Sequence, residues 1–135
     1  MLYETEEDRF AERAALDAFE REYGVVCVQL KPQYPVDAMM IVDGKPAAFI
    51  EVKCRKNKSD AYPTVLAAVH KIIRLLELEN ATGFPGMMLF RWRDRWGTIS
   101  AKQCKQYPVT VHGSGDRGET GYEPCFLVPV GDVQI

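Results

Sequence analysis

The stretch of sequence that decides the fold is residues 35–54, which read PVDAMMIVDGKPAAFIEVKC. Two apolar runs, 38–42 and 47–54, flank the dipeptide Asp43-Gly44. Asp-Gly between apolar runs is a strong hairpin signal, because both residues tolerate the left-handed backbone of a tight turn. The stretch therefore predicts two antiparallel strands joined by a short turn.

The register of this hairpin decides whether two carboxylates meet. With a three-residue loop, 43–45, position 42 pairs with 46 and Asp37 lies directly opposite Glu51. Opposed residues have Cβ atoms about 4.5–5.5 Å apart, and two carboxylates that close repel unless a positive charge lies between them. A two-residue loop would point them to opposite faces, so the hypothesis requires an odd-numbered loop or a β-bulge.

The triplet Glu51-Val52-Lys53 adds a cation to this pair. Side chains alternate along a strand, so Glu51 and Lys53 share one face while Val52 points into the core. Mg²⁺ keeps most of its waters and binds one or two carboxylates together with phosphate. The residues thus predict a Mg²⁺ site beside a phosphate group, and we expect Mn²⁺ to substitute.

The rest of the chain predicts an α/β architecture in one domain, 1–135. Helices are predicted over 6–23, before Gly24, and over 63–80, with Pro63 in the first turn. The basic segment 55–62 is expected to be a mobile loop. The order α-β-β-β-α-β-β is typical of an α/β sandwich around a mixed sheet. The other predicted strands are 25–30, 87–92, 98–101, 109–111 and 126–130.

The charges are unevenly distributed although the net charge is only −2. Residues 53–105 carry eleven basic and four acidic side chains, whereas residues 1–52 carry five basic and eleven acidic ones. A basic segment in an acidic chain can present a local phosphate-binding face. The sequence lacks an apolar run of about 18 residues, which a membrane-spanning helix needs, and a signal-peptide pattern. We therefore expect a cytoplasmic protein that does not bind membranes.

Together, the P-x-D motif at 35–37, the apolar strand and turn, and Glu51-Val52-Lys53 between two helices resemble the PD-(D/E)XK nuclease superfamily. The resemblance covers about residues 8–93 and is closest to small archaeal-type Holliday-junction resolvases and related phage-type repair nucleases. It implies a restriction-endonuclease-like α/β/α sandwich with a central mixed β-sheet, an α-β-β-β-α-β core followed by C-terminal strands. It also implies Mg²⁺-dependent DNA hydrolysis in recombination or repair and, because such resolvases are dimers, a homodimer.

The resemblance assigns roles to individual residues. Asp37 and Glu51 match the metal-binding acids of the family and Lys53 matches its catalytic lysine, while the carbonyl of Val52 would complete the coordination. Glu12 matches the first-helix glutamate that such resolvases use as an extra ligand, and Glu20 is the alternative.

The sequence departs from the pattern on the helix after the motif, where related nucleases often carry glutamine or tyrosine. Residues 63–80 contain neither, so His70 or Lys71 is the available substitute. Side chains that we expect to contact DNA are Arg55, Lys56, Lys58, Lys71, Arg91 and Arg93.

Three further patterns have simple interpretations. Residues 91–96 interleave arginine and tryptophan, which fits either a stacking clamp for nucleic acid or a strand with Trp92 in the core. Residues 113–118 match G-x-G-x-x-G but lack the helix and acid of a dinucleotide site, so a flexible loop is predicted. The four cysteines are widely spaced and are expected to be buried or incidental thiols.

The predicted function is therefore a metal-dependent endodeoxyribonuclease that acts on branched or structured DNA. Two rivals stay open: an exonuclease or restriction-type nuclease of the same fold, and a non-catalytic nucleic-acid-binding domain.

Overall fold

The computed structural model describes residues 6–113 and 122–134. Its helices are α1 (Glu6–Tyr23), α2 (Val69–Thr82) and the short α3 (Ala101–Cys104), and a 3-10 turn, η1, spans Val130–Asp132. The strands are β1 (Val26–Gln29), β2 (Ala38–Val42), β3 (Lys45–Cys54), β4 (Thr64–Ala68), β5 (Gly86–Arg91), β6 (Trp96–Ser100), β7 (Val109–Gly113) and β8 (Tyr122–Pro129).

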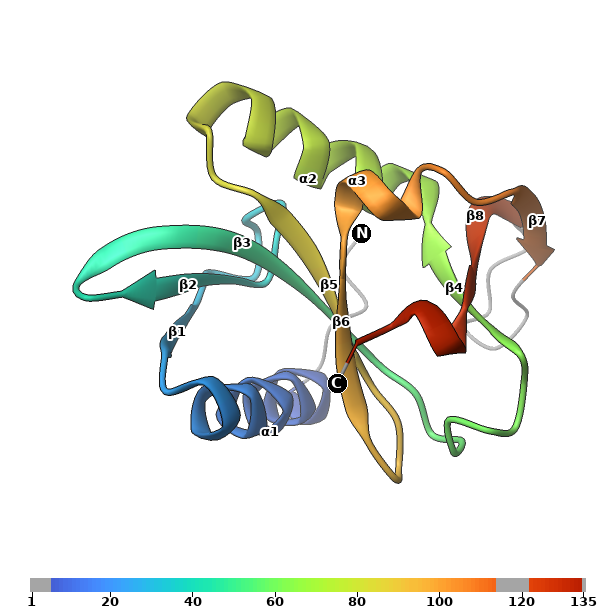
Figure 1. Cartoon of the computed structure of the whole chain (residues 1–135), viewed down its shortest axis with the longest axis horizontal. Helices are drawn as coiled ribbons and strands as arrows, with labels where there is room; N and C mark the ends of the chain where they lie inside the picture. The colour runs from blue at the N-terminus through green and yellow to red at the C-terminus, as the bar shows by residue number, and fades with distance from the viewer. Residues whose placement is uncertain (1–5, 114–121, 135) are drawn as a thin grey trace.

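The centre of the described part of the chain is a five-stranded mixed sheet with the strand order β1-β2-β3-β5-β6. Strands β3 and β5 are parallel, and the other neighbours are antiparallel. Helix α1 covers one face of this sheet, whereas α2 and α3 lie on the other (Figure 1). The predicted mixed sheet between helices is therefore present.

Helix α1 begins and ends where the sequence predicts. Its first turn carries three acids, which interact favourably with the positive end of the helix dipole. At its end, Gly24 has a φ of 65°, and its N–H donates to the carbonyl of Glu20 at 2.8 Å. Leu16 and Phe19 pack against Ile50 and Val52 of β3, which fixes the helix on the sheet.

The β2–β3 hairpin has a two-residue loop rather than the three-residue loop, which was one of the two alternatives that the hypothesis allowed. Val42 pairs with Lys45, and positive φ angles at Asp43 and Gly44 form the tight turn. The register then shifts by one residue between Met40 and Ile41, as in a β-bulge. The bulge lies beside Pro46, which has no N–H to donate to the ladder.

This bulge restores the alignment that a two-residue loop would have broken. Ala38 pairs with Ile50, and continuing that register by one residue brings Asp37 level with Glu51. The hairpin thus uses the bulge, one of the two solutions that the hypothesis required.

The second predicted helix, 63–80, is wrong in its first part. Residues 64–68 form β4, which pairs with β8 in a second, three-stranded sheet of order β4-β8-β7. Val65 and Ala67 are buried while their neighbours are not, which is the two-residue period of a strand. The spacing from Val65 to Val69 fits a helix as well as it fits this strand, which explains the error.

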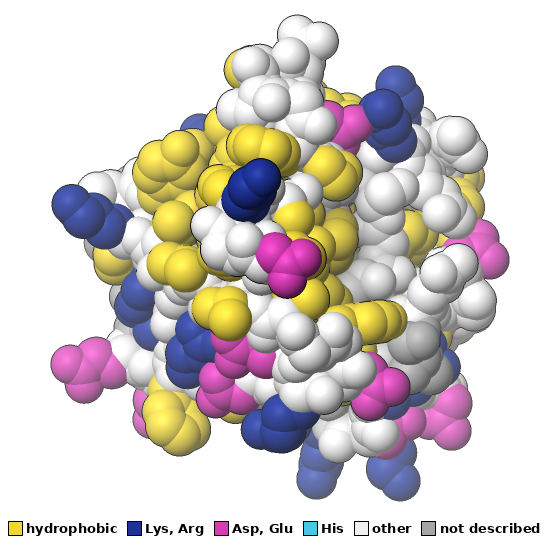
Figure 2. All heavy atoms as spheres, turned by 60° about the vertical axis from the view of Figure 1, so that its left-hand side comes forward, with side chains coloured by type: hydrophobic (Ala, Val, Ile, Leu, Met, Phe, Trp, Pro, Cys, Tyr) yellow, Lys and Arg dark blue, Asp and Glu magenta, His cyan; other side chains and the backbone are white. Residues whose placement is uncertain are grey.

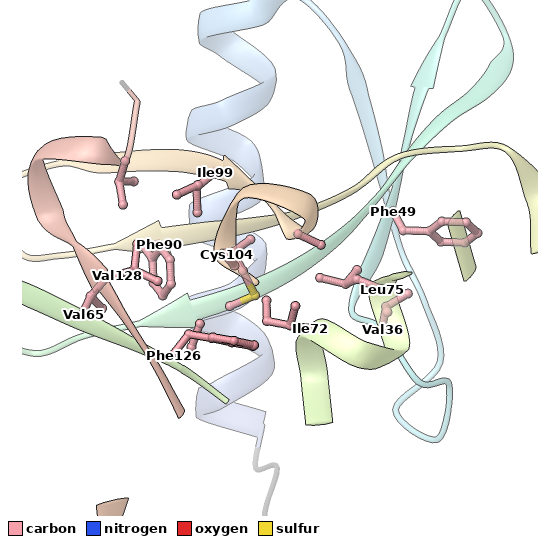
Figure 3. Close-up of a cluster of buried hydrophobic side chains, with 14 of the residues drawn as sticks. Val36, Phe49, Val65, Ile72, Leu75, Phe90, Ile99, Cys104, Phe126 and Val128 are labelled. Atoms are coloured by element: carbon pink, nitrogen blue, oxygen red, sulfur yellow. The ribbon is translucent and has the colours of Figure 1, made fainter. Parts of the chain in front are cut away.

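The main core lies between the two sheets and helices α2 and α3. Phe49 and Phe90 from the central sheet meet Ile72 and Leu75 from α2 and Phe126 from β8 (Figure 3). A smaller core lies under α1, on the opposite face. All four cysteines are described as free thiols, and three of them are buried, as predicted.

Two boundaries near the end of the sheet also differ from the prediction. Strand β6 begins at Trp96 rather than at Thr98, and the helix α3 was not predicted. Among the described residues, no helix is long and apolar enough to span a membrane.

Candidate active site

Asp37 lies at the end of the central sheet, one residue before β2. Its carbonyl accepts a hydrogen bond of 2.8 Å from the N–H of Leu30, just after β1. Its Oδ2 accepts another, also of 2.8 Å, from the N–H of Val52 in β3. Backbone and side chain are thus both fixed, and the carboxylate lies against β3.

Glu51 is the neighbouring acid, and it is 6% exposed. It shares the face of β3 with Phe49, so it points toward α2. There Lys71 Nζ lies 3.1 Å from Glu51 Oε2. Glu51 Oε1 is buried and has no hydrogen-bond partner among the described residues.

The surroundings of Glu51 favour its protonated form. Burial and the nearby Asp37 carboxylate raise the pKa of Glu51 to about 7, although Lys71 and Lys53 act in the opposite direction. Burial penalises a charge, and a second carboxylate penalises it further. An additional positive charge beside the two carboxylates would therefore be favourable.

Lys53 follows Glu51 on the same face of β3 and is half-buried. It acts electrostatically on Glu51 and also on Cys125 of β8, together with Arg55. The lysine therefore lies between the central sheet and the second sheet, beside Glu51.

Glu12 reaches the same end of the sheet from α1, on the opposite face. It is 9% exposed, and its Oε2 accepts a hydrogen bond of 3.2 Å from Gln29. The charged neighbours of the Cys54 thiol include Glu12, Asp37 and Lys53, which places all three near the end of β3. The role of Glu12 as a metal ligand stays a prediction.

Glu20, the alternative to Glu12, is used within the fold. Its Oε1 accepts from Arg13 at 2.9 Å and its Oε2 accepts from the N–H of Cys27 at 2.7 Å. These bonds attach α1 to the edge strand β1. Of the two glutamates, Glu12 is thus the better candidate.

The described residues contain no group of three or more histidine, cysteine, aspartate or glutamate side chains that could hold a metal ion. The candidate ligands are therefore the pair Asp37 and Glu51, together with the carbonyl of Val52, the residue that follows Glu51. Two carboxylates are sufficient for Mg²⁺, because water and phosphate provide its other ligands. The buried, unpartnered Glu51 Oε1 fits such an ion.

The predicted DNA-contacting residues fall into two groups. Arg55 and Arg91 are half-buried and donate to backbone carbonyls, Arg55 to Leu66 at 3.1 Å and Arg91 to Ala14 at 3.3 Å. They help to hold the elements around the site together. The exposed members of the set are Lys56, Lys58 and Arg93, and Lys71 contacts Glu51 as described above.

The basic segment after β3, expected to be mobile, is anchored at its centre. The N–H and the hydroxyl of Ser59 both donate to the carboxylate of Asp94, each at 2.7 Å. The N–H of Arg93 donates to the carbonyl of Asn57 at 3.1 Å. The sequence analysis did not predict this anchor. The only local sign of it was Asp94, a single acid among the arginines of residues 91–96.

The tryptophans of 91–96 do not form an exposed clamp. Trp92 is 2% exposed in the main core, and the Arg95 guanidinium lies 5.5 Å from the centre of its ring. Trp96 packs against Phe19 and Tyr23 of α1. The core interpretation is therefore correct. The glycine-rich pattern at 113–118 lies almost entirely outside the described residues, which omit 114–121.

Of the two substitutes considered for the missing glutamine or tyrosine, only Lys71 contacts a candidate ligand. The side chain of His70 is more than half exposed, and its Nδ1 lies 3.9 Å from Glu123 of β8. Burial, followed by the charge of Lys71, lowers the pKa of His70. His70 is thus directed to the second sheet.

Comparison with known proteins agrees with this arrangement. A family model described as "Phage putative PDDEXK endonuclease" matches residues 1–134. The chain belongs to this family. The candidate residues Asp37, Glu51 and Lys53 all lie within the matched residues. No curated protein matches the chain.

Among solved structures, this PDDEXK endonuclease resembles Archaeoglobus fulgidus Hjc, a Holliday junction resolvase from an archaeal hyperthermophile. The TM-score is 0.58 at 13% sequence identity, and the match covers 90% of this chain and 88% of that one. At this identity the likeness concerns the fold, and it confirms the predicted restriction-endonuclease-like architecture.

Proposed function

We propose that this PDDEXK endonuclease is a divalent-metal-dependent endodeoxyribonuclease that hydrolyses phosphodiester bonds in branched or otherwise structured DNA. Its place would be in recombination or repair in the cytoplasm. The observation that carries the proposal is the Asp37 carboxylate just before β2, bound to the N–H of Val52 and close enough to Glu51 to raise the pKa of Glu51, with Lys53 next to Glu51 on one face of β3. Family membership supports the endonuclease activity, and the Hjc fold supports a branched substrate by analogy.

The chemistry of the ligand set supports Mg²⁺ as the ion, with Mn²⁺ as a substitute. Asp37 and Glu51 would hold it, and the carbonyl of Val52 is a further oxygen donor on the same strand. A buried carboxylate oxygen without a partner is costly, and Glu51 Oε1 has none within residues 6–113 and 122–134. A bound cation would remove that cost and the repulsion between the two acids.

When bound, the ion would polarise a phosphate oxygen and lower the pKa of a water molecule. Lys53 would donate to the attacking water or to the negative charge that develops on the phosphate oxygens. Water then attacks phosphorus in line, and the bond from phosphorus to the leaving oxygen breaks. This step needs no covalent intermediate with the protein.

The surroundings of the site offer several groups to the DNA backbone. Lys56, Lys58 and Arg93 are exposed around the anchor formed by Ser59 and Asp94. The first turn of α2 also adjoins the site through Lys71 and contains no acid. A helix N-terminus of this kind is favourable for phosphate.

We also propose that the protein is a homodimer, as its resemblance to resolvases implies. Figure 2 shows apolar side chains gathered on one side of the molecule. Val26 and Val28 of the edge strand β1 are exposed, and so is Val42, the last residue of β2. Asp43 and Lys45 in the hairpin carry opposite charges, so in a two-fold dimer built on this edge the acid of one copy would be able to meet the lysine of the other. Val26→Glu with Val28→Glu should yield a monomer in sedimentation equilibrium, and an unchanged mass would rule out this face.

The activity test uses supercoiled plasmid and a synthetic four-way junction, each incubated with Mg²⁺, Mn²⁺ or EDTA. We expect cutting of the junction with either metal, none with EDTA, and none by the Asp37→Ala variant. Degradation from linear ends alone would favour an exonuclease. Binding without cutting, unchanged by Asp37→Ala, would favour a non-catalytic DNA-binding domain.

A further inference from the structure

The two carboxylate oxygens of Glu51 have different surroundings. Oε2 lies 3.1 Å from Lys71 Nζ, whereas Oε1 is buried without a hydrogen-bond partner among the described residues. The Glu51 side chain is 8% exposed and the Lys71 side chain 39% exposed. The lysine thus approaches from the solvent side and binds one oxygen only.

The position of Lys71 is fixed by its neighbour in the sequence. Ile72 is fully buried in the main core, together with Leu75 one turn later, and they pack α2 against the central sheet. Lys71 is the third residue of α2, so its backbone lies on a rigid element at the level of Glu51. A cation on a rigid helix can hold a carboxylate in one orientation.

We propose that Lys71 is a positioning residue of the metal site: it holds Oε2 of Glu51 and thereby keeps Oε1 available to the ion. This inference rests on the function proposed above and adds to it a residue outside the motif. Groups that bind a metal-ligating carboxylate from behind orient it, and their loss weakens metal binding by roughly 10–100-fold.

Two other roles for Lys71 predict different results. If Lys71 occupied the place of the cation and competed with it, its removal would strengthen metal binding, because one positive charge would leave the site. If the ion pair served only the packing of α2, its removal would change stability and leave metal affinity unchanged. The direction of the change in metal affinity therefore separates the three roles.

The experiment is a calorimetric titration of the full chain with Mn²⁺ alone, without DNA. We expect Kd to rise roughly 10–100-fold in Lys71→Ala and to recover partly in Lys71→Arg, which keeps a cation at this position. The matched control is Lys102→Ala, which removes another lysine–glutamate pair, with Glu79 at 2.8 Å, and should leave Kd unchanged. Circular dichroism checks that each variant is folded, and Lys71→Gln replaces Lys71→Ala if that variant is not.

An unchanged or lower Kd in Lys71→Ala overturns the positioning role. If the wild type still binds Mn²⁺ and cuts the junction, the proposed function stands and this inference alone fails. If the wild type binds no Mn²⁺ and cuts DNA no faster than Asp37→Ala, the proposed function and the positioning role of Lys71 both fail.

Discussion

The side chain of Asp37 takes the place of a strand partner for Val52, whose N–H donates to Asp37 Oδ2 at 2.8 Å. Strand β2 begins only at Ala38, so the carboxylate continues the ladder beside β3 where the backbone of β2 no longer does. One carboxylate therefore combines a structural hydrogen bond with the role in metal binding proposed above. Substitutions that separate charge from hydrogen bonding can test the two tasks one at a time.

Replacement of Asp37 by asparagine should strongly slow cleavage without unfolding the protein. Asparagine keeps an oxygen that accepts from the N–H of Val52 but loses the charge that a cation requires. We expect cleavage to fall roughly 10²–10³-fold, as when a single electrostatic group is removed from an active site. Asp37→Ala should in addition lose about 1–3 kcal/mol of stability, because it leaves a buried N–H without a partner. Plasmid nicking and urea denaturation measure the two effects.

The control for this pair is Asp43→Asn in the hairpin turn. Asp43 is exposed and has a φ of 51°, which asparagine tolerates. It should leave cleavage and stability unchanged. Full activity in Asp37→Asn would remove Asp37 from the set of metal ligands.

Replacement of Glu51 by glutamine should stabilise the metal-free protein while abolishing its activity. The folded state raises the pKa of Glu51 from 4.5 to about 7, so it binds the proton more tightly than the unfolded state. Below about pH 4.5 Glu51 is protonated in both states and does not lower the free energy of unfolding. Between about pH 4.5 and pH 7 its ionisation lowers this free energy progressively, and above about pH 7 the loss is constant. Glutamine is neutral throughout. We expect a gain on the order of 2–3 kcal/mol above pH 7, a net value because the raised pKa already includes the opposing attraction of Lys71.

Urea denaturation in EDTA at several pH values measures this difference between variant and wild type. Glu79→Gln is the control of opposite sign. Hydrogen bonds from Lys102 and from the N–H of Gly86 lower the pKa of Glu79. The ionised Glu79 carboxylate therefore stabilises the folded protein at neutral pH, and this stabilisation is lost as the pH falls. Glu79→Gln should therefore destabilise at pH 7. A Glu51→Gln variant that is less stable than wild type at pH 8 would contradict the burial argument.

The central hairpin and its acids could be predicted because their signals are local. The alternation of side chains along β3 is sufficient to place Glu51 and Lys53 on one face. Asp43-Gly44 is sufficient to place the turn. The sequence did not decide between a three-residue loop and a β-bulge, because the bulge depends on how Pro46 fits against the facing strand, which no local pattern records.

The contacts that sequence reasoning missed join residues far apart in the chain. Strand β4 is defined by its pairing with β8, about 60 residues later, and a helical spacing from Val65 to Val69 concealed it. Because β4 ends at Ala68, α2 begins only at Val69. Lys71 therefore lies in the first turn of α2, where it contacts Glu51. The bond between Ser59 and Asp94 spans 35 residues. Such pairings depend on tertiary structure, which overrides local preference.

Removal of the Asp94 carboxylate should loosen the basic segment after β3. Asp94→Ala removes both hydrogen bonds from Ser59, so the segment should open locally more often without global unfolding. We expect trypsin to cut after Lys56 and Lys58 several-fold faster, as seen by mass spectrometry of limited digests. Asp60→Ala also removes one negative charge, here from the basic segment itself but without touching the anchor, and should leave the digestion rate unchanged. Equal rates in all three proteins would show that the anchor does not restrain the segment.

The salt dependence of DNA binding should report on Lys56 and Lys58. Each lysine that neutralises a phosphate contributes a slope of about −0.9 to the logarithm of affinity against the logarithm of salt concentration. Lys56→Ala with Lys58→Ala should therefore flatten the slope by about 2 for a four-way junction bound in EDTA, with a similar loss for any DNA sequence. Lys102→Ala with Lys105→Ala removes the same charge at α3, away from the site, and should leave the slope unchanged. If instead Lys102→Ala with Lys105→Ala flattened the slope and Lys56→Ala with Lys58→Ala did not, the DNA would lie against the C-terminal end of α2. The segment after β3 would then take no part in DNA binding.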